Sequence, residues 1–251
     1  EGPEQRLARA AGAADWEGLL GRKELLLPFK QLRELPAGIG RLAGLERLDL
    51  EGNRLASLPP ELGQLAALRD LQLMDNRLEE LPEGLGGLAA LQALDLEGNR
   101  LASLPAALGA LAELRRLSLA SNLLAELPGC VCELQALKAL NLTENRLARL
   151  PEGLARLRSL RSLCLGRNRL QFLPEGLGEL GELQELEAHG NSLLELPESF
   201  GRLGALASLN LNGNQLEELP ESFGRLGALA QLHLERNGLA ALPESFGGLA
   251  A

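Results

Sequence analysis

The stretch Leu48–Pro59 reads "LDLEGNRLASLP", and the same twelve letters return at Leu94–Pro105. A second stretch, "LPESFGRLGALA", occupies residues 196–207 and again residues 219–230. The copies of the first stretch begin 46 residues apart and those of the second begin 23 residues apart, so the underlying period is 23. Self-similarity at a fixed period of this length indicates an array of stacked structural units.

Nine complete repeats align from Leu42 to Gly248, with no insertion or deletion between them. Each follows L-x-x-L-x-x-L-x-L-x-x-N-x-L-x-x-L-P-x-x-L-x-x, with few departures. A degenerate tenth repeat, residues 19–41, keeps most of the leucines and the proline but has Lys30 where the asparagine belongs. The asparagines of the complete repeats are Asn53, Asn76, Asn99, Asn122, Asn145, Asn168, Asn191, Asn214 and Asn237.

Each residue type in the pattern has a physical role. The L-x-L segment alternates with period two, which predicts a short strand with one buried face. Asparagine at the strand end offers an amide donor and a carbonyl acceptor to backbone groups that the turn leaves unpaired. Proline suits the start of a short helical turn. Because one repeat cannot bury its leucines alone, the sequence predicts an α/β solenoid of ten stacked repeats with parallel strands.

The pattern resembles that of leucine-rich-repeat proteins, and the constant 23-residue repeat with "LP" is similar to that of the intracellular Ras-group subclass. The resemblance covers Leu19–Ala251. It implies a horseshoe with the parallel sheet on the concave face and short helical turns on the convex face. It also implies binding of protein partners in signalling, with small GTPases and phosphatases among the partners of relatives.

The first 18 residues lack the repeat and are rich in Ala, Arg and Glu. We expect a helix from about Glu4 to Trp16, weakened at Gly12, that caps the first repeat, because terminal repeats need such caps. A partner-binding amphipathic helix is the alternative. The expected domains are therefore a capping helix over residues 1–18 and one repeat domain over residues 19–251 with a truncated last repeat.

The last complete repeat is followed by only three residues, "LAA". We therefore expect Leu239, Leu242 and Phe246 to be partly exposed beside an unpaired strand edge. Such an edge favours association, here end to end between two chains. This ending is also the one expected of a fragment of a longer protein.

The composition argues against several partners and cofactors. A net charge of −9 and the absence of tyrosine disfavour nucleic acid. The chain has no run of 18 apolar residues, so no membrane span is expected. Cys130 and Cys132, in "GCVC", are interpreted as small hydrophobic residues rather than as a metal or redox site. Three cysteines are too few for the disulfide-bonded caps of extracellular relatives, so we expect a cytoplasmic protein without cofactors.

The surface left for function consists of the side chains that point outward between the strand leucines. They include acids, amides, histidines and the only methionine, whereas the leucines hardly vary. A constant scaffold with one varied face predicts a binding surface on the concave side. The expected protein-binding residues are Asp49, Glu51, Asp70, Gln72, Met74, Asp75, Asp95, Glu97, Arg116, Asn141, Glu187, His189, Asn210 and His233.

We expect the arginines that follow the asparagine to form a basic rim beside the acidic residues of the concave face. Such a pairing of charges would orient a charged protein partner, and arginines in a row also bind carboxylate or phosphate groups. The alternative is a solvated surface on which acids and arginines offset each other. The expected rim residues are Arg54, Arg77, Arg100, Arg146 and Arg169.

Catalysis is not expected. Cys164, Glu187 and His189 fall on adjacent predicted strands with His233 beyond them, but an open wall offers neither a pocket nor exclusion of water. Nothing there would fix three or four zinc ligands around one point.

We therefore predict a non-enzymatic scaffold that binds a protein partner through its concave face. The alternative is the recognition arm of a larger kinase, ubiquitin ligase or immune receptor. A third interpretation, an engineered repeat protein, is disfavoured by the irregular repeat with Lys30 and by Ala188 in a leucine position.

Overall fold

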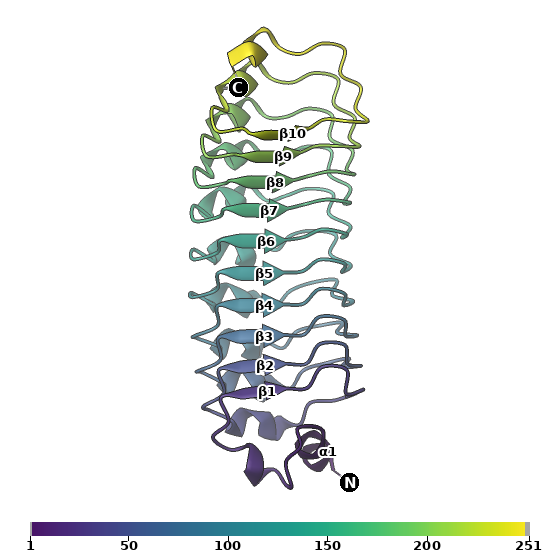
Figure 1. Ribbon diagram of the computed structural model, residues 1–251, viewed down its shortest axis with the longest axis vertical. Coiled ribbons are helices and arrows are strands. Elements are labelled where there is room, and N and C mark those ends of the chain that lie inside the picture. The colour runs from purple at the N-terminus through teal and green to yellow at the C-terminus, as the bar shows by residue number, and fades with distance from the viewer. Residues whose placement is uncertain (1, 249–251) are drawn as a thin grey trace. The chain divides into compact units, whose positions relative to one another are not determined.

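The computed structural model describes residues 2–248, and its chain divides into two compact units, Glu1–Leu123 and Leu124–Ala251 (Figure 1). We call them the N-terminal half and the C-terminal half and describe each by itself. The partial repeat expected from Leu249 onward lies outside the described residues.

Every repeat contributes one strand of three residues, and within each half neighbouring strands pair in parallel with a register shift of one repeat. Leu48 pairs with Leu71, for example, and Leu163 with Leu186. The strands of the N-terminal half are β1 (Glu24–Leu26), β2 (Arg47–Asp49), β3 (Asp70–Gln72), β4 (Ala93–Asp95) and β5 (Arg116–Ser118). Those of the C-terminal half are β6 (Ala139–Asn141), β7 (Ser162–Cys164), β8 (Glu185–Glu187), β9 (Ser208–Asn210) and β10 (Gln231–His233).

A short 3-10 helix follows the proline of each repeat, on the side of each half away from the strands (Figure 1). The prolines sit just before these helices in an extended conformation, with φ −71° and ψ 142° at Pro59. The helices of the N-terminal half are η2 (Ala37–Arg41), η3 (Pro60–Gln64), η4 (Glu83–Gly87) and η5 (Ala106–Ala110). Those of the C-terminal half are η6 (Gly129–Glu133), η7 (Glu152–Arg156), η8 (Glu175–Glu179), η9 (Glu198–Arg202), η10 (Glu221–Arg225) and η11 (Glu244–Gly248).

The core of each half lies between the strands and these 3-10 helices. Nearly all pattern leucines are buried there, and Phe200 and Phe223 replace leucine in the last repeats with no exposed surface. Their rings lie parallel, 6.1 Å apart. The expected α/β solenoid of parallel strands and short helical turns is thus confirmed.

The conserved asparagine joins each repeat to the one before it. In Asn99, Nδ2 donates to the carbonyl oxygens of Leu73 and Leu96, both at 3.0 Å, and Oδ1 accepts from the backbone N–H of Leu78 at 2.9 Å. Leu73 and Leu78 belong to the preceding repeat. The side chain is 6% exposed, so these backbone groups have no access to water as a substitute partner.

The residue just before the asparagine has a positive φ in every complete repeat, which the repeat pattern did not predict. Glycine occupies this left-handed position in only four of the nine repeats; Gly98, for example, has φ 67°. Elsewhere the position is taken by residues such as Glu144, at φ 57°, and Arg167, at φ 55°. A left-handed conformation costs a residue with a Cβ about 1–2 kcal/mol, so the turn into the asparagine is imposed by the stacked repeats.

The N-terminal helix is shorter than expected: α1 spans Pro3–Ala10 and does not reach Trp16. Gly12, with φ 68°, ends it, because the N–H of Gly12 bonds the carbonyl of Arg9 and the N–H of Ala13 bonds that of Ala8. This pair of bonds is the usual way in which a left-handed glycine terminates a helix. A 3-10 turn, η1 (Glu17–Leu19), leads into the first repeat.

Four contacts attach this segment to the first repeat. Leu7 and Trp16 are buried, and ion pairs join Arg6 to Glu34 at 2.6 Å and Arg41 to Glu17 at 3.1 Å. These contacts agree with a capping role, and that role stays our interpretation.

At the other end of the array, the residues of the last complete repeat are less buried than their equivalents. Leu239 and Phe246 are partly exposed and Leu242 is 51% exposed, as expected. End-to-end association through them stays a prediction.

The hydrogen bonds that successive asparagines make to the preceding repeat form a series that we call the asparagine ladder. Removing one asparagine side chain tests what this ladder contributes to stability. We expect Asn99→Ala to lower the free energy of unfolding by about 1–3 kcal/mol, because the buried N–H of Leu78 loses its partner and the carbonyls of Leu73 and Leu96 each lose one of two donors. Urea denaturation measures the change. Gln215→Ala, at an exposed position beside another ladder asparagine, is the control and should change stability by less than about 0.5 kcal/mol. Equal stability of both variants would contradict a structural role for the ladder.

The left-handed turn gives a second test. We expect Gly98→Ala to destabilise the protein by about 1–2 kcal/mol, and an added Cβ would also lie 2.4 Å from Oδ1 of Asp75. Gly44 has open space around it and no positive φ, so Gly44→Ala should leave stability unchanged or slightly raise it. Thermal unfolding of the two variants side by side checks this, and a midpoint of Gly98→Ala at or above that of Gly44→Ala would refute it.

Candidate functional site

The strand face, defined as the outward side chains of the strands and of the two residues after each strand, is the expected binding surface. Within the N-terminal half the third strand residues form one column in register, in which Asp49 pairs with Gln72 and Gln72 with Asp95. All three are half-buried between their neighbours. The predicted column therefore exists, with its side chains held about one strand spacing apart.

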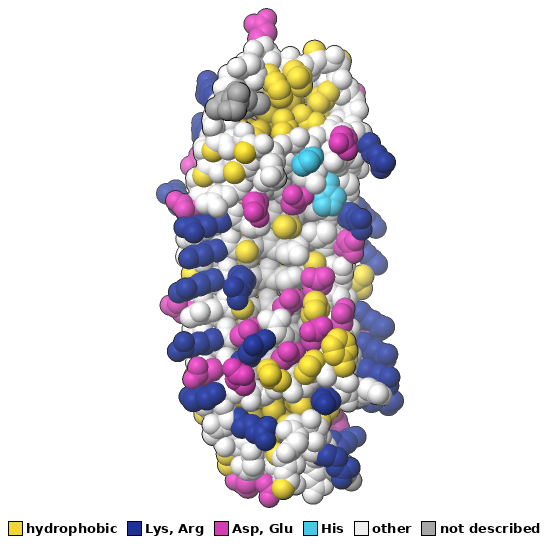
Figure 2. Space-filling model, viewed as in Figure 1, with side chains coloured by type: hydrophobic (Ala, Val, Ile, Leu, Met, Phe, Trp, Pro, Cys, Tyr) yellow, Lys and Arg dark blue, Asp and Glu magenta, His cyan; other side chains and the backbone are white. Residues whose placement is uncertain are grey.

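Acidic side chains gather on the strand face of the N-terminal half (Figure 2). Asp49 and Asp95 each fold back, so that Oδ1 accepts the backbone N–H two residues on, from Glu51 and from Glu97, at 3.0 Å. Burial raises the pKa of Asp95 above its ordinary value, and the charges of Asp70 and Asp75 raise it further, against the hydrogen bond from Glu97. Asp70 and Asp75 thus lie close enough to Asp95 to disfavour the ionisation of its carboxyl.

Cations line both edges of this acidic strip (Figure 2). The expected rim, Arg54, Arg77 and Arg100, is exposed. A second row on the opposite edge was not predicted as a row, and Arg116 is its only predicted member. Arg47 of this row contacts Asp70, with Nε 3.6 Å from Oδ2. The members of the second row in this half are Arg47, Arg69, Arg115 and Arg116.

An apolar patch lies beside the acids on the first repeats. Leu26 is 48% exposed and Phe29 66% exposed, and Met74 is half-buried. The ring of Phe29 lies against Gly52, where an added Cβ would stand 2.2 Å from it. Sequence analysis missed Phe29; the signal available was an aromatic residue in the only repeat without the asparagine.

The strand face of the C-terminal half is less charged. Asn141 and Asn210 fold back as the aspartates do and accept the N–H of Thr143 and Asn212 at 3.1 Å. A hollow of about 350 Å³ opens beside them, lined by His189, Gly190, Asn210, Asn212, Gly213, Glu235 and Arg236. Arg146, Arg169 and His233 are exposed, and the structure does not bring them into this hollow.

The residues considered for catalysis do not form an activated group. Nδ1 of His189 lies 3.4 Å from Oε2 of Glu187, and the ring covers Gly166, where a Cβ would stand 2.5 Å away. Burial raises the pKa of the Cys164 thiol, and Glu187 and Glu185 raise it further, which is the opposite of what a thiolate nucleophile needs. Within residues 2–248, no three His, Cys, Asp or Glu side chains are grouped to hold a metal ion.

The two remaining cysteines lie on η6. Both are thiols that take part in no disulfide among the described residues, Cys132 buried and Cys130 half-buried, and burial raises the pKa of Cys132. They flank the fully buried Val131, in keeping with their interpretation as small core residues.

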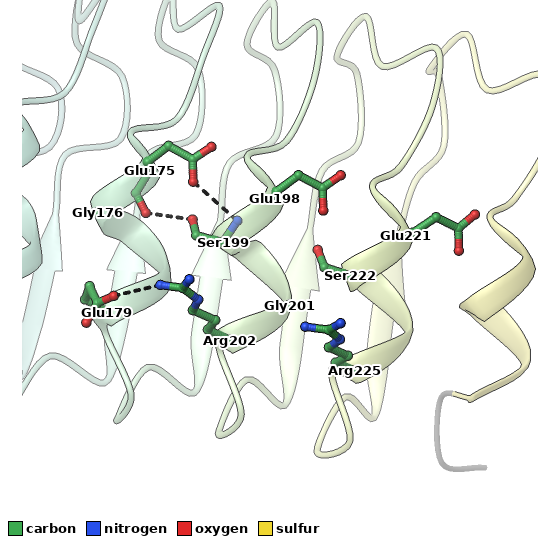
Figure 3. Close-up of a pocket in the computed structure, with 10 residues that line it drawn as sticks. All are labelled: Glu175, Gly176, Glu179, Glu198, Ser199, Gly201, Arg202, Glu221, Ser222 and Arg225. Carbon is green, nitrogen blue, oxygen red and sulfur yellow. Dashed lines mark hydrogen bonds and ion pairs between the residues drawn. The ribbon is translucent and has the colours of Figure 1, made fainter.

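A groove of about 580 Å³ runs along the 3-10 helices of the C-terminal half (Figure 3). Its polar groups largely serve the next repeat. Oε2 of Glu175 accepts the N–H of Ser199 at 3.3 Å, and Oγ of Ser199 donates to the carbonyl of Glu175 at 2.6 Å. Arg202 and Glu179 form an ion pair at 3.1 Å. The groove was not predicted, although a glutamate after "LP" in successive repeats was its signal.

Comparison of the chain with known protein families gave two family models that match it. One, a leucine-rich-repeat region, matches residues 106–192, and the other, a leucine-rich repeat, matches residues 42–101 and 182–239. The chain is therefore built of leucine-rich repeats and has the fold of such a solenoid. Comparison with curated proteins gave no match. Within the described residues, no helix has the length and apolar character to cross a membrane.

Solved structures show the same fold. A leucine-rich-repeat protein of Leptospira interrogans is 36% identical with a TM-score of 0.84, over 87% of this chain and 56% of that one. The leucine-rich-repeat ectodomain of a plant membrane receptor kinase from Arabidopsis thaliana, solved in complex with Casparian strip integrity factor 2, is 31% identical with a TM-score of 0.71, over 94% and 32%. The chain thus spans about half of the first protein and about a third of the second.

The crowded acids give a pH-dependent prediction. Because the pKa of Asp95 is raised in the folded state, its contribution to stability is present at low pH and is lost as pH rises through that pKa. Asp95→Asn should therefore stabilise the protein at pH 7, by on the order of 0.5 kcal/mol, and not at pH 3. Asparagine keeps the acceptor, as Asn141 and Asn210 show. Thermal midpoints at both pH values test this; a gain at pH 3 alone would contradict it.

Proposed function

We propose that the chain is a non-enzymatic scaffold that binds a protein partner through the strand face, chiefly of its N-terminal half. The observation that carries the proposal is the contrast between a core that repeats leucine after leucine and a strand face on which acids, cations and exposed apolar side chains are segregated. Leucine-rich repeats commonly mediate interactions between proteins, including in receptors.

The arrangement suggests how a partner is oriented. The acidic strip between two cationic rows is a pattern of three charged bands, which a partner with complementary bands meets in one orientation. Leu26 and Phe29 supply exposed apolar surface at one end, where burial by a partner adds affinity that exposed charges alone do not supply. A cationic partner residue near Asp95 would favour ionisation of this carboxyl, whose pKa is raised.

The finer assignment follows from the sequence resemblance. The constant 23-residue repeats with "LP" support a member of the Ras-group subclass that acts in the cytoplasm in signalling, with a small GTPase or a phosphatase as partner. The three cysteines form no disulfide among the described residues, which suits a reducing compartment, in which thiols persist.

A second function has support from the solved structures. The plant ectodomain belongs to a receptor kinase and is solved in complex with Casparian strip integrity factor 2, and another similar structure is a TDR receptor, 27% identical with a TM-score of 0.75. This chain covers less than half of each of these chains. A recognition arm within a larger receptor or enzyme is therefore the alternative, and it uses the same strand face.

Charge reversal on the strand face tests the proposal. A partner is first captured with the wild-type chain and identified, and its dissociation constant is then measured by calorimetry. We expect Asp49→Lys/Asp95→Lys/Glu97→Lys to weaken binding at least tenfold, about 1.4 kcal/mol, with little change in the thermal midpoint.

The matched control carries the same change of charge away from the strand face. Glu80→Lys/Glu83→Lys/Glu113→Lys replaces three exposed acids of the same half and should leave binding within about twofold of wild type. Equal weakening by both triple variants would mean that net charge governs binding, and unchanged binding by the first would move the site elsewhere.

A further inference from the structure

A second hollow is lined by none of the strand-face side chains. It has a volume of about 430 Å³ and opens between helix α1 and the loop that follows β1, both within the N-terminal half. The lining side chains come from Pro3, Arg6, Arg9 and Ala10 of α1 and from residues 30–34 of the loop. Two segments that lie about one repeat length apart in the sequence thus line the same hollow.

The hollow is strongly cationic in an acidic protein. Its lining holds four cations, Arg6, Arg9, Lys30 and Arg33, and one acid, Glu34, so its net charge is +3 in a chain of net charge −9. Glu34 pairs with Arg6 at 2.6 Å and is thereby neutralised. The side chains of Lys30 and Arg33 form no ion pair or hydrogen bond with any of the residues that the structure describes. Among residues 2–248, these two cations therefore have no counter-charge.

The loop that carries them has a backbone unlike that of any complete repeat. Phe29 and Gln31 both have a positive φ, 56° and 58°, whereas a complete repeat has one such residue, just before the asparagine. Oδ1 of Asn53 accepts the N–H of Lys30 at 3.1 Å and that of Leu32 at 3.0 Å, which holds the loop in this shape. Strained backbone that neighbouring groups hold in place is a recurrent feature of ligand sites.

We propose that this hollow binds a phosphate monoester. At neutral pH a monoester carries a charge of about −1.5 to −2, which matches the two uncompensated cations, whereas a carboxylate carries one charge. The Arg33 guanidinium offers two parallel N–H donors to phosphate oxygens, and Lys30 adds a point charge.

The size and walls of the hollow suit a phosphate with its carbon skeleton. Its volume far exceeds the roughly 30 Å³ that one water molecule occupies, so the phosphate would not fill it alone. Pro3, Ala10 and Leu32 supply apolar wall for the group that carries the phosphate. This site is separate from the strand face and does not depend on the function proposed for it.

Nuclear magnetic resonance titration tests the proposal on the whole chain. The probes are phenyl phosphate, phenylacetate as its carboxylate match, and a short phosphoserine peptide, all at roughly 0.15 M salt to screen nonspecific attraction. We expect phenyl phosphate to shift the amides of residues 30–34 and 6–10 and the Nε–Hε signal of Arg33 in a saturable way. Phenylacetate should bind at least tenfold more weakly. Tighter binding of the peptide than of phenyl phosphate would assign the phosphate to a protein partner, and equal binding would assign it to a small molecule; both support the site.

Paired variants of equal charge separate a site from general attraction. Lys30→Gln/Arg33→Gln should weaken phenyl phosphate at least tenfold. Arg77→Gln/Arg100→Gln removes the same charge from the rim of the same half and should change affinity less than twofold. Thermal midpoints confirm that both variants fold, as exposed positions predict. Equal loss in both variants, shifts that do not saturate, or equal binding of phenylacetate would overturn the proposal.

Discussion

The asparagine side chain is the constraint on which the remaining structure depends. Its amide donates to a carbonyl 26 residues earlier and its oxygen accepts from an N–H 21 residues earlier, and both distances in sequence recur along the array. An insertion in one repeat would misplace these partners and leave buried backbone groups unpaired, at about 1–3 kcal/mol each. The fixed 23-residue period therefore follows from hydrogen bonding as much as from leucine packing.

Features carried by a residue type that recurs with the period were predictable from sequence, and features imposed by neighbouring segments on varied residues were not. The strands, the 3-10 turns and the ladder asparagines follow from local pattern and from the need of each repeat for a stacked partner. The left-handed residue before the asparagine escaped prediction because residues as different as Gly98 and Arg167 occupy it, so that stacking overrides their own preferences. The expected helix extended past Gly12 to Trp16, whereas α1 ends at Ala10, because a left-handed glycine is the usual helix terminator.

The candidate site likewise has features that could be predicted from the sequence and features that could not. The columns of the strand face could be assigned residue by residue because parallel strands in register keep side chains aligned. Their electrostatics could not be predicted, because the pKa of Asp95 is raised chiefly by burial of its carboxyl and further by the charges of Asp70 and Asp75 in the neighbouring repeat. The second cationic row was missed because its members occupy two adjacent pattern positions, and only the strand geometry shows that Arg47 and Arg115 border the same strip.

The irregular first repeat follows from the ladder itself. A ladder asparagine serves the repeat before it, so an asparagine at position 30 would need a strand carbonyl near Glu4 and a free N–H near Arg9. Both residues lie in α1, where the backbone groups bond within the helix. An asparagine there would therefore lack the two partners in the preceding repeat that Asn99, for example, has. The position is therefore released from the constraint, and a lysine held by Asn53 through its backbone alone can direct its charge at the hollow beside α1.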